Sequence, residues 1–138
     1  MEGNNKNLFF SLLTGLLLGI ALMFSKLNFL AFFAFIPLFL TISDLKSPKK
    51  RFFFGFISGL IYFLFIFQWL WGTHPLANLG IDNKLFSLII VFLLYFLSAA
   101  DMAIFWGLFT LFIPNFKNTN YLKNIIFIPF CFIFFEFI

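Results

Sequence analysis

Charge is what this 138-residue sequence has least of. Only 10% of its residues are charged, whereas 63% are hydrophobic and the mean hydropathy is +1.08. A soluble domain of this length could not bury so much apolar surface, which excludes the soluble fold classes. The basic residues give a net charge of +4, but they stand between apolar runs and form no stripe that could follow phosphates. Nucleic acid is therefore not an expected partner.

Reactive side chains are also scarce. The single cysteine, Cys131, excludes an internal disulfide, and the single histidine, His74, has no second ligand at metal spacing. The sequence contains no glycine-rich phosphate loop, no metal-ligand cluster and no Ser/His/Asp set. It predicts no metal, no cofactor and no catalytic residue within this chain.

Five apolar runs, separated by short polar stretches, make up the chain. Long uncharged runs are typical of transmembrane helices, so we expect an all-α integral membrane protein. The predicted fold is a bundle of about five transmembrane helices that forms one domain over residues 1–138. The last run has fifteen residues and is short for a span, so that helix is either marginal or incomplete. The expected helices cover residues 8–24, 27–42, 52–71, 85–113 and 124–138.

The basic residues fall unevenly on the two sides of such a bundle, which predicts an orientation. With the N-terminus inside, seven Lys and Arg residues lie on the inner side and two on the outer side. We therefore expect a multi-pass protein of the inner membrane with a cytoplasmic N-terminus. The inner set is Lys6, Lys46, Lys49, Lys50, Arg51, Lys117 and Lys123, and the outer set is Lys26 and Lys84.

Small residues recur every fourth position in three of the runs. Such spacing places them on one helix face, where a neighbouring helix can approach closely. We expect a close crossing of the first and third spans, with their glycine faces together. The predicted packing residues are Ser11, Gly15 and Gly19, then Gly55 and Gly59, then Ala99, Ala103 and Gly107.

Two carboxylates lie in apolar runs. Asp101 sits inside the fourth run, where an ionised carboxylate is costly and should face protein or water. It is either a proton, ion or headgroup contact, or a protonated or hydrogen-bonded carboxyl that helps helices associate. Glu136 is either an interface carboxylate near a chain end or, if the helix continues in a longer protein, a cavity carboxylate.

A polar and aromatic cluster ends the third run. Gln68, Trp69, Trp71 and His74 either line a site at the outer surface or form an interfacial aromatic belt. With Asp101 and Glu136, they are the candidate cavity-lining residues. Cys131 is read as structural, because an apolar run suppresses the thiolate.

The order of these features resembles a known family. Basic residues followed by GFISGLIYFLFIFQWLWGT are similar to the third transmembrane helix of bacterial apolipoprotein N-acyltransferases, with Gly55, Gly59 and Trp69 at the matching positions. The segment AFIPL resembles the Pro-Leu segment of helix two, and NLG stands where the family often has an aromatic-Gly-Gly loop. PFCFIFFE resembles the family's Pro-x-x-Trp-x-x-x-Glu, with Phe132 in place of Trp. The second Gly of the outer loop is absent, and Asp101 has no counterpart in the family pattern.

The resemblance implies the membrane portion of an enzyme of lipoprotein maturation. In the family, a Glu-Lys-Cys triad in an extracytoplasmic nitrilase-like domain takes an acyl chain from a phospholipid as a thioester. It then passes the chain to the α-amino group of a lipoprotein's diacylglyceryl cysteine, so phospholipid and lipoprotein are the implied partners. None of the triad maps onto this chain, which we expect to be a truncated part that is inactive alone. The alternative is a non-enzymatic small membrane protein, such as a transporter subunit or helix-bundle scaffold, with Asp101 as its functional residue.

Overall fold

The chain folds into α-helices joined by short 3-10 segments. A computed structural model describes residues 2–113, and the fifth predicted run, with Cys131 and Glu136, lies outside this part. The helices are α1 (Glu2–Met23), α2 (Leu30–Asp44), α3 (Pro48–Ile66) and α4 (Lys84–Phe112), and the 3-10 segments are η1 (Ser25–Leu27), η2 (Phe67–Thr73) and η3 (Leu76–Leu79). The all-α membrane bundle predicted from the sequence is confirmed. Three stretches are long and apolar enough to cross a membrane, namely Asn4–Met23, Pro48–Thr73 and Lys84–Phe112.

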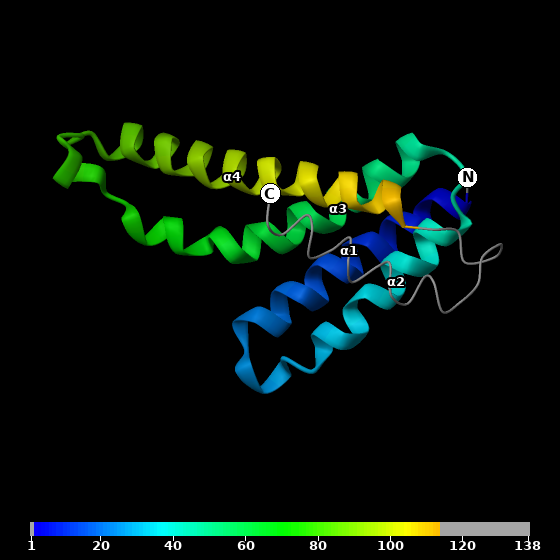
Figure 1. Cartoon of the computed structure of the whole chain (residues 1–138). Helices are drawn as coiled ribbons and strands as arrows, with labels where there is room; N and C mark the ends of the chain where they lie inside the picture. The colour runs from blue at the N-terminus through cyan, green and yellow to red at the C-terminus, as the bar shows by residue number, and fades with distance from the viewer. Residues whose placement is uncertain (1, 114–138) are drawn as a thin grey trace.

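The helices form two hairpins that meet at one end and diverge at the other (Figure 1). The start of α1, the α2–α3 connection and the end of α4 gather at the right of Figure 1. The tip of the α3–α4 hairpin lies at the far left, whereas the tip of the α1–α2 hairpin lies lower and nearer the centre. Lys46, Lys49 and Lys50 therefore lie at the gathered end, whereas Lys26 and Lys84 mark the two separate tips.

Local sequence explains where the helices begin. Pro48 occupies the first turn of α3, where its missing N–H costs nothing and its fixed φ suits a helix. Asn83 precedes α4, and its side chain accepts hydrogen bonds from the backbone N–H groups of Leu85 and Phe86. Gly80 ends η3 with φ of 79°, a left-handed conformation that glycine adopts without a Cβ clash.

The observed helices differ from the predicted ranges in three places. The first begins at Glu2, because the polar residues before the apolar run continue the helix. The third predicted span changes from α-helix to 3-10 helix at Phe67. Within this region Tyr95 Oη donates to the carbonyl oxygen of Leu64 at 2.8 Å, a contact from outside the helix. The second predicted helix is observed as the fifteen-residue α2, with Pro37 inside it. At about 1.5 Å per residue it is roughly 22 Å long, which is short for a bilayer.

Glycines hold α1 against α3. A Cβ added at Gly15 would lie 2.5 Å from the backbone oxygen of Ser58 and 2.8 Å from Ile61 Cβ. A Cβ at Gly19 would meet the ring of Phe65. Larger residues at these two positions would force the helices apart, so the small-residue stripe of α1 lies against α3.

The glycine face of α3, however, does not meet that of α1. A Cβ at Gly59 would lie 2.7 Å from Trp106 Cβ, and one at Gly55 would meet Thr110, so these glycines face α4. In return, Gly107 of α4 faces Phe52 of α3. The expected meeting of two glycine faces is wrong, because the α1 stripe lies against Ser58, Ile61 and Phe65 of α3, whereas the α3 glycines take up side chains of α4.

Trp106 stands at the centre of the packing. It is buried with Leu18 of α1 and Ala34 of α2. Its ring lies 5.8 Å from that of Phe35 in a stacked arrangement and 5.8 Å from that of Phe63 edge to face. A second cluster joins α2 and α4, with Leu38, Ile42, Phe109 and Ile113.

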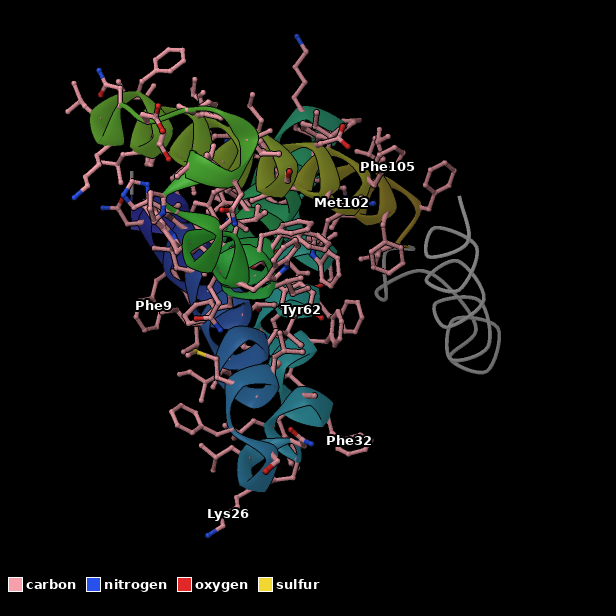
Figure 2. All side chains as sticks on the ribbon, turned by 90° about the vertical axis from the view of Figure 1, so that its left-hand side faces the viewer. Phe9, Lys26, Phe32, Tyr62, Met102 and Phe105 are labelled. Atoms are coloured by element: carbon pink, nitrogen blue, oxygen red, sulfur yellow. The ribbon has the colours of Figure 1, made fainter. Side chains whose placement is uncertain are left out.

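The outside of the bundle is apolar. Phe32 is 84% exposed, and Phe9, Phe32 and Phe105 all project from the outer faces of their helices (Figure 2). Water would oppose so large an apolar surface, so the lipid hydrocarbon is the environment that suits it.

Candidate functional site

The tip of the α3–α4 hairpin is built on Ser87. This side chain is 0% exposed, and its Oγ accepts a hydrogen bond from the backbone N–H of Leu76 at 2.8 Å. His74 Nδ1 lies 3.0 Å from the same oxygen, so the ring and the hydroxyl are within hydrogen-bond distance. Ser87 thereby ties the segment after η2 to the first turns of α4.

The aromatic residues of η2 divide into two kinds. Trp71 packs on α4, with its ring 5.5 Å from that of Tyr95 and 6.4 Å from that of Phe92. Trp69 is 62% exposed, and Gln68 beside it is exposed too. The tip therefore has an aromatic contact that stabilises it and an aromatic surface that faces outward.

Asp101 is not part of this cluster. It lies fourteen residues beyond Ser87 on α4, which is about 21 Å along the helix axis. Its side chain is exposed, whereas Ala99 and Ala103 are fully buried on another face of the helix. A carboxylate in such a place costs about 2.5–3.5 kcal/mol on insertion scales, so Asp101 needs a partner or water there. Glu136, the remaining candidate, lies outside the described residues.

The described part of the chain offers no obvious catalytic centre. Ser87 and His74 stand at the distance of a nucleophile and a base, but the hydroxyl is fully buried and already accepts from Leu76. No group of three His, Cys, Asp or Glu residues that could hold a metal occurs among residues 2–113.

The structure also offers a shallow hollow of about 290 Å³ at the opposite, gathered end. Pro48, Lys49, Phe52 and Leu111 line it. It does not involve the residues at the tip, so the cluster of Gln68, Trp69, Trp71 and His74 is an outer surface in this structure, not the wall of this hollow.

Sequence reasoning missed the polar contacts within the bundle. Trp106 Nε1 donates to Ser58 Oγ at 3.2 Å, and Ser58 Oγ donates to the Gly55 oxygen at 2.9 Å. Thr110 Oγ1 lies 3.0 Å from the Arg51 oxygen and 2.6 Å from the Gly107 oxygen. The available signal was Trp106, a tryptophan that stands six residues before the end of α4.

Arg51 has more than a topological role. Its Nε donates to the Leu45 oxygen and its Nη1 to the Ile113 oxygen, both at 2.9 Å. These are the carbonyl groups just past the ends of α2 and α4, which have no partner within their helices. The planar guanidinium reaches both at once, which the ammonium group of lysine does not do in the same geometry.

Comparisons with known proteins identify the family. The family model described as apolipoprotein N-acyltransferase N-terminal domain matches residues 14–138. Comparisons with curated proteins and with solved structures each gave no match. The matched range takes in the second half of α1, the rest of the described chain and the last apolar run, which is most of the chain. Together with its apolar helical bundle, this match shows that the chain belongs to the apolipoprotein N-acyltransferase N-terminal domain family.

Proposed function

We propose that this chain anchors the catalytic domain of an N-acyltransferase at the outer face of the inner membrane and borders a lipid-accessible cavity there. The observation that carries the proposal is the α3–α4 tip within the family match. Ser87 holds this tip to α4, and Trp69 is exposed near the end of the apolar stretch Pro48–Thr73. Tryptophan favours the headgroup level of a bilayer, so this position suits contact with lipid headgroups. A tip that Ser87 fixes to α4, with the exposed side chain of Trp69 at its edge, suits a place where lipid enters a site.

The proposed role in the reaction is positional. The acyl chain of a phospholipid and the diacylglyceryl cysteine of a lipoprotein would meet a thiol supplied by the catalytic domain, and this chain would align the lipid. It would have no transferase activity alone. An N-acylation assay with a diacylated lipopeptide and phospholipid in proteoliposomes tests this, and measured transfer by the isolated chain would contradict the proposal.

The orientation is part of the proposal, because the α3–α4 tip must lie outside. In a Cys131→Ser background, Lys26→Cys and Lys46→Cys place single thiols at opposite ends of the bundle. An impermeant maleimide added to intact cells should label position 26 and spare position 46 until the membrane is broken. The reverse pattern would place the tip in the cytoplasm and contradict the proposal.

A photoreactive phospholipid tests the cavity rim. With a diazirine near the headgroup, cross-links should concentrate in residues 67–79 at the α3–α4 tip. The α1–α2 tip, residues 24–29, is the matched internal control, since Phe24 and Phe29 there are 55% and 54% exposed. Equal labelling of both tips would show ordinary lipid contact in place of a specific rim.

A further inference from the structure

The gathered end of the bundle is the most basic part of the described chain (Figure 1). Two acidic residues lie at this end, Glu2 and Asp44, against five basic residues, which are Lys6, Lys46, Lys49, Lys50 and Arg51. The guanidinium of Arg51 already donates to the carbonyl oxygens of Leu45 and Ile113, whereas the four lysine side chains are exposed. This end therefore offers ammonium groups to a negatively charged partner.

The shallow hollow of about 290 Å³ lies at the same end, between α3 and α4. Pro48, Lys49 and Phe52 line it from α3, and Leu111 lines it from α4. Pro48 is also the first residue of the apolar stretch Pro48–Thr73. Because such a stretch begins where the hydrocarbon meets the headgroups, the hollow lies at that boundary, with Lys49 beside its apolar residues.

Packing between α3 and α4 fixes the apolar wall of the hollow. A Cβ added at Gly107 would lie 2.8 Å from the ring of Phe52, so this ring fills the space beside the glycine. The ring of Phe52 also stacks on that of Phe56, with the centroids 6.2 Å apart. A wall that is already in place loses little conformational freedom when a ligand binds.

The chemistry and the size of the hollow suit part of a lipid. Sites that enclose a drug-sized ligand measure about 300–1,000 Å³, so this hollow takes a headgroup and the start of a chain but not a whole phospholipid. Basic pockets between membrane helices bind anionic headgroups. We propose that the hollow binds one anionic phospholipid, with its phosphate at Lys49 and the first carbons of an acyl chain against Phe52 and Leu111.

Lys50 separates such a site from the general attraction of basic residues to a membrane. It is exposed and adjacent to Lys49, but it lies about 100° further around the helix and is not among the residues that line the hollow. A diffuse attraction would use both lysines equally, since both lie at the membrane surface. A lipid seated in the hollow depends on Lys49 more than on Lys50.

Native mass spectrometry of the full chain in detergent tests the headgroup contact, because it counts bound lipid molecules. Phosphatidylglycerol and phosphatidylethanolamine with identical acyl chains differ in headgroup charge. One lysine near an anionic lipid contributes about fivefold in affinity, so the parent chain should hold its first phosphatidylglycerol at least about fivefold more tightly than phosphatidylethanolamine. Lys49→Gln should remove most of this preference, whereas the matched control Lys50→Gln should change it by less than about twofold.

Three results of this experiment would overturn the proposal. Equal losses in Lys49→Gln and Lys50→Gln would show a diffuse field in place of a site. An equal affinity of the parent chain for the two lipids would show that the headgroup charge is not read. A parent chain that retains neither lipid would show that protein covers the hollow.

The apolar part of the site has its own test. Leu111→Trp fills the hollow without changing the charge and should lower the phosphatidylglycerol affinity at least about fivefold. Leu97→Trp is the matched control, because Leu97 is 60% exposed and lies fourteen residues away on α4, about 21 Å along the axis. If Leu111→Trp melted at the parent temperature and still bound the lipid as the parent does, the hollow would not hold an acyl chain.

Glycerol 3-phosphate, which has the phosphate but no acyl chain, distinguishes a lipid from a soluble anion. It should not displace phosphatidylglycerol at equal concentration, and displacement would assign the site to soluble phosphate esters and overturn the proposal. The site lies at the opposite end of α3 from the tip that we propose as a rim for substrate lipid. Its failure would therefore leave the proposed function unchanged.

Discussion

The contact between α3 and α4 makes Gly59→Ala the most informative single change in the bundle. The new Cβ would lie 2.7 Å from Trp106 Cβ and 2.8 Å from Trp106 Cγ, whereas carbon atoms rest about 3.5–4.0 Å apart. Trp106 Cβ cannot swing away, because it is attached to the backbone and its ring is held among Phe35, Tyr62 and Phe63. The helices must therefore separate locally by about 1 Å.

The separation affects more than van der Waals contact. Trp106 Nε1 and Ser58 Oγ are 3.2 Å apart, so a further 1 Å or so would break their hydrogen bond. Overpacking costs about 1–3 kcal/mol, and a hydrogen bond between membrane helices adds about 0.6 kcal/mol. The lower backbone entropy of alanine returns about 0.5–1 kcal/mol. The net expectation is a loss of about 0.6–3 kcal/mol in the free energy of unfolding.

Unfolding in mixed micelles, followed by circular dichroism as the denaturing detergent increases, measures this loss. Gly72→Ala is the matched control, since a Cβ there meets nothing within 4 Å. It should leave the unfolding free energy within about 0.5 kcal/mol of the parent chain. If Gly59→Ala also stayed within that margin, the close approach of α3 and α4 at Trp106 would be refuted.

Three further changes test the polar contacts. Arg51→Lys keeps the charge but loses the guanidinium that bonds the carbonyl groups at the ends of both α2 and α4. It should lower the unfolding free energy by about 1–2 kcal/mol in the same micelle titration, whereas the control Lys50→Arg should not lower it. Ser87→Ala removes the acceptor of the Leu76 N–H, so hydrogen exchange at that amide should become about tenfold faster, measured by mass spectrometry. Tyr95→Phe removes the bond to the Leu64 oxygen and should cost about 0.5–1.5 kcal/mol in the unfolding titration; an unchanged midpoint would contradict it.

The sequence was most informative where one physical rule acts over many residues. Long apolar runs predicted the helices, because the bilayer requires about twenty apolar residues for each span. The run at residues 27–42 also predicted a helix, but the observed α2 has only fifteen residues and ends at Asp44, so it is shorter than a full span. The change to 3-10 helix at Phe67 was not predicted either. Beside it the Leu64 oxygen accepts a hydrogen bond from Tyr95, which is far away in the chain, and no sequence pattern encodes that bond.

Small-residue spacing predicted contact faces but not their partners. Gly15 and Gly59 have the same spacing signal, yet one lies against Ser58 of α3 and the other against Trp106 of α4. The partner of a glycine depends on which backbone or side chain lies opposite, and that requires the relative placement of two helices. The exposure of Asp101 likewise depends on which face of α4 packs against the other helices. The apolar run alone does not show which face that is.

Side-chain hydrogen bonds distinguish the two hairpins. The α3–α4 hairpin is bonded at four depths, by Arg51 at the gathered end, then by Trp106, then by Tyr95, and by Ser87 at the tip. On α1, the described side-chain bonds of Ser11 and Thr14 return to α1 itself, at 3.0 Å each. The α1–α2 hairpin includes apolar packing of Leu18 with Ala34, and its tip diverges from that of α3–α4 (Figure 1). Since a domain that aligns a reactive thiol needs a fixed support, we expect the α3–α4 tip to carry it, and the α1–α2 tip to be the more readily displaced.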